Sequence, residues 1–151
     1  INHIHGYGKH GKDTFMQSLA ENGVDPNNEH FIIREYIDNM YTCMCASDLI
    51  ITRAGAMTLT ELMAIGRASI LIPYPYAAEN HQYYNALTLQ NANAGRIIDD
   101  KELTGAVLID TVTKLADDPE LLKLMSENAA KLSKHDAAGV ILREITDLMG
   151  L

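Results

Sequence analysis

Short apolar segments alternate with amphipathic segments along the chain. Five short stretches predict strands, at residues 2–7, 30–36, 48–52, 69–73 and 95–98. The segments between and after them predict helices, at residues 13–21, 38–46, 57–65, 80–91, 102–116, 118–132 and 136–148. Strands that are apolar on both faces and separated by helices pack as a buried parallel sheet. The pattern therefore predicts an α/β fold, a Rossmann-like parallel sheet flanked by helices.

Composition narrows the classes of function. The 151 residues are 47% hydrophobic and 21% charged, which suits one packed domain spanning residues 1–151. The formal net charge of −8 argues against a nucleic-acid partner, because phosphate-backbone binding needs clustered Lys and Arg. No apolar run is long enough to span a bilayer, and no signal peptide is visible. Cys43 and Cys45 lie two residues apart on a predicted helix and point in different directions, so we interpret both as reduced packing residues of a cytoplasmic protein. The chain begins with Ile1 and not with Met, so we expect a fragment of a longer protein.

A glycine-rich segment at residues 6–13 resembles two phosphate-binding loops without matching either fully. It satisfies the G-x-G-x-x-G pattern of a dinucleotide site and most of the P-loop pattern. Asp13, however, stands where a P-loop needs a hydroxyl, and its carboxylate would repel phosphates. We therefore favour a structural glycine-rich turn. The nearby His3, His5 and His10 have no acidic or Cys partner at ligand spacing, so we predict no metal site.

The segment after the third predicted strand is a stronger candidate for an anion site. The strand ends at Thr52, a turn of small residues follows, and a helix begins near Met57. Gly55 lets the backbone approach a ligand closely. The first amide groups of the helix, around Ala56 to Thr58, have no partner within it and lie at the positive end of its dipole. This arrangement suits a diphosphate.

Two roles are open for Glu61, one turn into the same helix. The pattern Thr58-x-x-Glu61 before an apolar run is typical of a capping box, in which the carboxylate binds a backbone N–H group. Alternatively, Glu61 faces the ligand and accepts two hydrogen bonds from the vicinal hydroxyls of a ribose, since a carboxylate has two acceptor oxygens.

The loop after the fourth predicted strand should lie beside the same site, because ligands of parallel sheets bind beyond the carboxyl ends of the strands. Asn80 is the candidate N-cap of the following helix. His81, Gln82 and Asn85 follow in its first turns. Amide and imidazole side chains at a helix start suit sugar hydroxyls, although a solvated polar face would show the same pattern.

Together these segments resemble the C-terminal domain of the MurG family, the UDP-N-acetylglucosamine–N-acetylmuramyl-(pentapeptide) pyrophosphoryl-undecaprenol N-acetylglucosamine transferases. The resemblance lies in residues 53–58 with Glu61, in Pro73-Tyr74-Pro75, and in Asn80-His81-Gln82 with Asn85-Ala86. It implies the C-terminal half of a two-domain GT-B glycosyltransferase. We expect this chain to lack the family's N-terminal acceptor domain and the first strand of the C-terminal domain.

The resemblance implies a role for each site residue. The uracil is implied to contact Tyr36 and the backbone of Ile37. The diphosphate is implied to face Gly55, Ala56, Met57 and Thr58, and the ribose to bind Glu61. The N-acetylglucosamine is implied to contact His81, Gln82 and Asn85.

The implied reaction is inverting transfer of N-acetylglucosamine from UDP-N-acetylglucosamine to undecaprenyl-diphospho-N-acetylmuramoyl-pentapeptide in peptidoglycan synthesis. It requires no cofactor or metal. The catalytic base, the lipid-linked acceptor and the contact with the cytoplasmic face of the plasma membrane are all assigned to the missing domain, so no catalytic residue is assigned here. Two alternatives stay open: another UDP-sugar glycosyltransferase, such as a glycolipid synthase, and a non-catalytic sugar-nucleotide-binding subunit.

Overall fold

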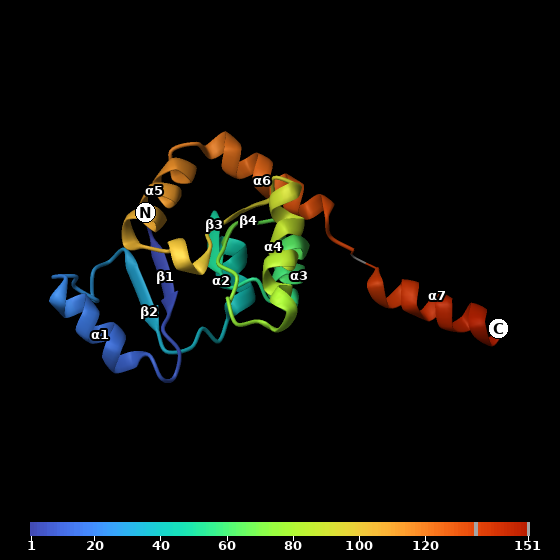
Figure 1. Cartoon of the computed structure of the whole chain (residues 1–151), viewed down its shortest axis with the longest axis horizontal. Coiled ribbons are helices and arrows are strands. Elements are labelled where there is room, and N and C mark those ends of the chain that lie inside the picture. Colours follow the sequence, from blue (N-terminus) through green and yellow to red (C-terminus); the bar gives the residue numbers. More distant parts are fainter. Residues whose placement is uncertain (135, 151) are drawn as a thin grey trace. The chain divides into compact units, whose positions relative to one another are not determined.

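The computed structural model describes residues 1–134 and 136–150, in which strands and helices alternate as far as β5 and three helices, α5 to α7, then follow (Figure 1). The strands are β1 (His3–Gly6), β2 (Phe31–Arg34), β3 (Leu49–Thr52), β4 (Ala68–Leu71) and β5 (Gly95–Ile97). The helices are α1 (Lys12–Glu21), α2 (Met40–Ala46), α3 (Ala56–Ile65), α4 (His81–Asn91), α5 (Gly105–Ala116), α6 (Pro119–Lys131) and α7 (Ala137–Met149). Two 3-10 turns, η1 (Ala78–Asn80) and η2 (Asp100–Glu102), precede α4 and α5. Each predicted strand and helix is present.

The chain forms two compact units, Ile1–Cys43 and a larger unit that begins at Met44. In the first unit, β1 and β2 pair in parallel, from His3 opposite Phe31 to Gly6 opposite Arg34, and α1 connects them. The ring of Phe15 on α1 stacks on His5 of β1 at 4.4 Å between ring centroids. Burial lowers the pKa of His5, and the charge of the neighbouring His3 lowers it further.

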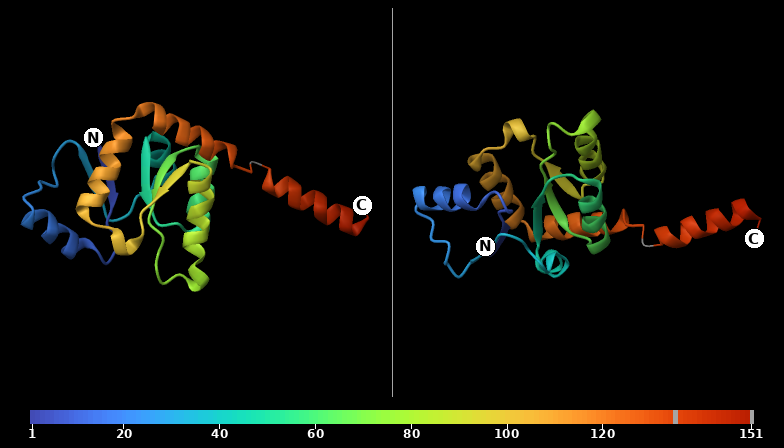
Figure 2. Two further views of the ribbon diagram at one scale, coloured as in Figure 1. Left: turned by 45° about the horizontal axis from the view of Figure 1, so that its top comes forward. Right: turned by 90° about the horizontal axis from the view of Figure 1, so that it is seen from below.

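The larger unit contains a three-stranded parallel sheet in the order β3-β4-β5 (Figure 2). All four residues of the central strand β4 are buried, because it has a neighbour on each edge and helices on both faces. Leu71 packs in one core cluster with residues of α3 and α4, whereas Ala68 and Ile70 pack in a second cluster with residues of α5 and α6. The sheet is thus sandwiched between helices, which confirms the predicted α/β class.

The end of α3 is fixed by the left-handed conformation of Gly66, whose φ is 62°. Its N–H group donates to Met63, and the N–H group of Arg67 donates to Leu62, so the last carbonyls of the helix have partners. A Cβ atom at position 66 would lie only 3.0 Å from the Cβ of Ala130 on α6. The conformation and this close approach both require glycine here.

The start of α5 differs from the sequence prediction. The helix begins at Gly105 and not at residue 102, because η2 ends at Glu102 and Leu103 is extended. Thr104 is the N-cap, and its hydroxyl accepts a hydrogen bond from the N–H group of Val107 at 3.2 Å. A capping side chain therefore decides where this helix begins.

Candidate functional site

The turn between β3 and α3 presents free amide groups at the tip of a helix. Gly55 is the N-cap of α3, and α3 receives no side-chain capping hydrogen bond. The first hydrogen bond within the helix runs from the N–H group of Leu59 to the carbonyl of Gly55, at 3.0 Å. The N–H groups of the three preceding residues, Ala56, Met57 and Thr58, therefore have no partner inside the helix. Their positions match the predicted anion site.

The space around Gly55 is open. Its φ of −67° and ψ of 143° are accessible to any L-residue. A Cβ atom at this position would contact only the hydroxyl oxygen of Thr58, at 4.0 Å. Neither the backbone conformation nor the packing of the protein therefore requires a glycine at the tip of α3. This contrasts with Gly66, where both do.

The capping-box interpretation of Thr58 and Glu61 is wrong. A capping box places its acidic residue three positions after the N-cap, which here is Thr58 itself. Glu61 lies further along α3, in its second turn, and is exposed. The sequence pattern misled because it would fit a helix that starts three residues later. The ribose contact of Glu61 stays a prediction.

Two side chains of α4 hold the residue that precedes Gly55. The carboxamide oxygen of Gln82 accepts hydrogen bonds from the N–H groups of Ala54, at 3.2 Å, and Tyr74, at 2.9 Å. The side-chain amide of Asn85 donates to the carbonyl of Ala54 at 3.3 Å. Ala54 is completely buried. The turns after β3 and β4 are thereby tied to one another and to α4. The sequence pattern predicts sugar contacts for Gln82 and Asn85 and gives no sign of these bonds to the backbone.

Arg53 connects the same turn to the ends of β4 and β5, and sequence analysis gave it no role. Its guanidinium nitrogen Nη1 lies 3.3 Å from the carbonyl oxygens of both Ile72 and Pro73 and 2.5 Å from Oδ1 of Asp100. The guanidinium carbon also lies 5.7 Å from the ring centroid of Tyr74. Arg53 therefore fixes the turn to the segments after β4 and β5 while its charge is paired with Asp100.

The turn before α4 has an unusual backbone. Glu79 and Asn80 both adopt left-handed conformations, with φ of 50° and 55°. Asn80 occupies the predicted N-cap position of α4, but its side chain makes no capping hydrogen bond. The Nδ1 atom of His81 lies 2.8 Å from the carbonyl of Ala78, and since a carbonyl only accepts, Nδ1 carries the proton. His81 is exposed, so the other ring nitrogen, Nε2, is available to a ligand.

The predicted uracil contacts belong to the first unit. Tyr36 is 73% exposed, and Ile37 is half-buried. Both follow the end of β2. Their contact with a base stays a prediction.

The glycine-rich segment after β1 has structural reasons for its glycines. Gly8 has a φ of 74°, and a Cβ atom at Gly11 would lie in contact with the carbonyl oxygen of Tyr7. The N–H group of Gly11 closes the turn by donating to Gly8 at 3.1 Å. These observations support the interpretation as a structural turn.

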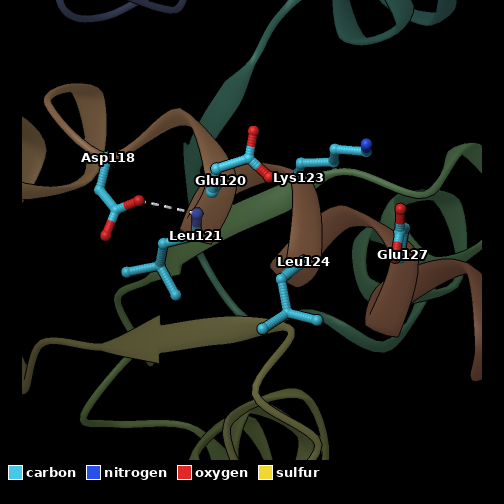
Figure 3. Close-up of a pocket in the computed structure, with 6 residues that line it drawn as sticks. All are labelled: Asp118, Glu120, Leu121, Lys123, Leu124 and Glu127. Atoms are coloured by element: carbon cyan, nitrogen blue, oxygen red, sulfur yellow. Dashed lines mark hydrogen bonds between the residues drawn. The ribbon is translucent and has the colours of Figure 1, made fainter.

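Surface hollows lie beside α6 and beside the turn after β4. One, of about 500 Å³, is formed by residues of the α6 segment alone (Figure 3). In Figure 3, Leu121 and Leu124 lie on one side of the helix and Glu120 and Lys123 on the other, and no predicted site residue lines the hollow. The other, of about 320 Å³, lies beside the turn after β4. Its lining residues are Pro73, Pro75, Asn80, Tyr83, Asp99, Asp100 and Lys101.

Within residues 1–134 and 136–150, no group of three or more His, Cys, Asp or Glu side chains is arranged to hold a metal ion. None of the helices in this described part of the chain has the length and apolar character that a membrane crossing requires.

Comparison with known protein families identifies the family of this chain. Residues 1–141 match the model of the glycosyltransferase family 28 C-terminal domain. The chain belongs to this family. Among curated relatives, the UDP-N-acetylglucosamine–N-acetylmuramyl-(pentapeptide) pyrophosphoryl-undecaprenol N-acetylglucosamine transferase of Desulforamulus reducens is 40% identical over 97% of this chain and 40% of its own length. The protein of the same name from a Thermoanaerobacter species is 48% identical over 75% of this chain and 31% of its own length.

A solved structure supports the same assignment. The crystal structure of Acinetobacter baumannii MurG is similar to this family 28 domain with a TM-score of 0.85 at 28% sequence identity. The similarity covers 97% of this chain and 41% of that protein. The resemblance stated from the motifs is thereby confirmed, as is the fold of a GT-B C-terminal half. The match spans between 31% and 41% of the length of these relatives.

Proposed function

We propose that this chain is the donor-binding part of an enzyme that transfers N-acetylglucosamine from UDP-N-acetylglucosamine to a lipid-linked N-acetylmuramoyl-pentapeptide. The observation that carries the proposal is the N-terminus of α3, where Gly55 is the N-cap and no side chain caps the first amide groups. Three amide groups and the positive end of the helix dipole suit the two phosphates of UDP. The names of the relatives support the choice of donor and acceptor.

The other contacts follow from the order of groups in the donor. We propose that Glu61 binds the ribose hydroxyls next to the diphosphate, and that Tyr36 and the backbone of Ile37 contact the uracil. On the sugar side, the exposed Nε2 of His81 accepts a hydrogen bond from an N-acetylglucosamine hydroxyl. The sugar contacts of Gln82 and Asn85 use only the hydrogen-bonding groups that their bonds to Ala54 and Tyr74 leave over.

The chemistry proposed for this chain is electrostatic. As the bond between the sugar and UDP breaks, negative charge grows on the leaving diphosphate. Amide groups that already point toward that position stabilise the charge without reorganising. The proposed reaction uses UDP-N-acetylglucosamine as a substrate and needs no further cofactor. We assign the general base, the acceptor and the attachment to the cytoplasmic face of the membrane to another part of the full-length protein.

Calorimetric titration of the chain with UDP, UMP and UDP-N-acetylglucosamine tests the proposal. We expect UDP to bind more tightly than UMP, because UMP lacks one phosphate for the tip of α3. UDP at about 100 times its Kd should add about 2.7 kcal/mol to the free energy of unfolding. The chain alone should show no transfer of labelled sugar to a lipid acceptor. Equal affinities for UDP and UMP, or no binding of either, would contradict the diphosphate site.

The identity of the sugar is tested separately. UDP-glucose and UDP-galactose should bind more weakly than UDP-N-acetylglucosamine. A preference for either of them would favour a different glycosyltransferase of the same architecture.

A further inference from the structure

We propose that Gln82 and Asn85 are positioning residues for the diphosphate and set the affinity for UDP even when no sugar is attached. They act through Ala54, which they hold by its N–H group and its carbonyl. This inference rests on the proposed function and changes what these two residues do within it.

The carboxamide oxygen of Gln82 is fully used by the protein. It has two lone pairs, and it accepts from the N–H groups of Ala54 and Tyr74 at 3.2 and 2.9 Å. No lone pair is left for a sugar hydroxyl, so only the NH2 group of Gln82 is available to a ligand. Asn85 likewise uses its NH2 group on the carbonyl of Ala54. Each side chain thus uses one of its two polar groups to bind the protein backbone.

The residue that they hold directly controls the tip of α3. The N–H group and the carbonyl of Ala54 belong to the two successive peptide planes that lead into Gly55. Fixing both planes sets the direction in which Gly55 enters the helix, and hence the direction of the N–H groups of Ala56 to Thr58. Ala54 is completely buried, so water cannot replace the lost partners without rearrangement.

Amide groups that are already oriented bind an anion with little ordering cost, whereas a loosened turn must be ordered each time. The positioning role therefore predicts an equal loss of affinity for UDP and for UDP-N-acetylglucosamine when Gln82 is replaced. A pure sugar contact predicts a loss for UDP-N-acetylglucosamine alone.

The same helix offers a matched control. The carboxamide oxygen of Gln90 also accepts a backbone hydrogen bond, from the N–H group of Ile97 at 3.0 Å, but it holds β5 and not the turns. Gln82→Met and Gln90→Met each replace a glutamine by a side chain of similar length that lacks the carboxamide. We expect Gln82→Met to lower the affinity for both ligands by the same factor, roughly tenfold, and Gln90→Met to change neither.

Amide hydrogen exchange provides a readout that does not need a ligand. Without its acceptor, the amide hydrogens of Ala54 and Tyr74 should exchange faster in Gln82→Met than in the wild-type protein, and not in Gln90→Met. If Gln82→Met fails to fold, Asn85→Leu removes the bond to the Ala54 carbonyl alone. It should also weaken UDP and UDP-N-acetylglucosamine equally.

Normal UDP affinity in Gln82→Met together with a loss specific to UDP-N-acetylglucosamine would overturn the proposal. Unchanged exchange of the Ala54 and Tyr74 amides would do so as well. If the wild-type chain bound no UDP at all, the proposed function itself would fail, and the exchange rates would still decide whether Gln82 holds the turn.

Discussion

Replacing Gly55 by alanine should separate the stability of the protein from its ligand binding. The φ and ψ of Gly55 are open to alanine, and the added methyl group meets nothing nearer than the Thr58 hydroxyl at 4.0 Å. Alanine restricts the unfolded chain, which stabilises the protein by about 0.4–1 kcal/mol. It is also a poorer N-cap than glycine, which costs about 0.5–1 kcal/mol. These effects nearly cancel, so the free energy of unfolding should change by less than about 0.5 kcal/mol.

The expected effect on UDP is much larger. The methyl group would occupy the space at the tip of α3 from which the proposed diphosphate approaches the free amides. A hydrogen bond to a charged group contributes about 1.5–3 kcal/mol. Losing one such bond would weaken UDP binding at least about tenfold. Calorimetric titration measures this loss, and urea unfolding measures the stability of the same preparation.

Gly66→Ala is the matched control, and its expected result is the reverse. Its φ of 62° and the 3.0 Å approach to the Cβ of Ala130 should cost at least about 1 kcal/mol of stability, while the folded protein keeps its affinity for UDP. Two results would refute the reasoning about Gly55: wild-type UDP affinity in Gly55→Ala, or a loss of stability as large as that of Gly66→Ala.

Two further predictions concern charged and titrating groups. Glu61→Gln should weaken UDP binding roughly tenfold without changing stability, because the exposed carboxylate is proposed to bind the ribose. The same substitution should weaken the binding of 2′-deoxy-UDP by a smaller factor, and an equal loss of affinity for the two ligands would contradict the ribose contact. His5 has a lowered pKa in the folded protein because burial, and secondarily His3, disfavours its charged form. Stability from His5 is therefore complete above about pH 6.5 and should be lost as the pH falls through its lowered folded pKa. Urea unfolding between pH 8 and pH 5 should show this loss, and His5→Gln should reduce it; an identical pH dependence in the variant would assign the loss to other groups.

The sequence was sufficient for the fold because the relevant signals are local. β4 is apolar on both faces, and the structure buries all four of its residues between helices. The predicted end of α3 at residue 65 is correct, and Gly66 follows it as the C-cap. The predicted start of α5 at residue 102 was wrong. The apolar pattern continues back through Leu103, whereas the hydroxyl of Thr104 fixes the first turn of the helix. A hydrophobic period locates a helix, but a single capping bond decides its first residue.

The candidate site could be predicted only in part. The strand, the small turn and the helix start around Gly55 are contiguous, so their pattern is visible in the sequence. The bonds that hold this turn join residues far apart: Gln82 to Ala54 across 28 positions and Arg53 to Asp100 across 47. No local pattern distinguishes a glutamine that binds a sugar from one that holds a backbone. The structure was needed to show that Gln82 does the latter.

An acidic chain can bind a diphosphate if the positive groups are parts of the backbone. The net charge is −8, and the nearest cation in the turn, Arg53, is already paired with Asp100. In α5 and α6 one of the first amides, that of Val107 and that of Leu121, donates to the side chain of the N-cap residue, Thr104 and Asp118 respectively. An aspartate at position 55 would cap α3 in the same way, but it would also place negative charge where the proposed diphosphate binds. Glycine at this N-cap leaves the amides open, and the hydrogen bonds that order the turn come instead from Gln82 and Asn85 of α4 and from Arg53.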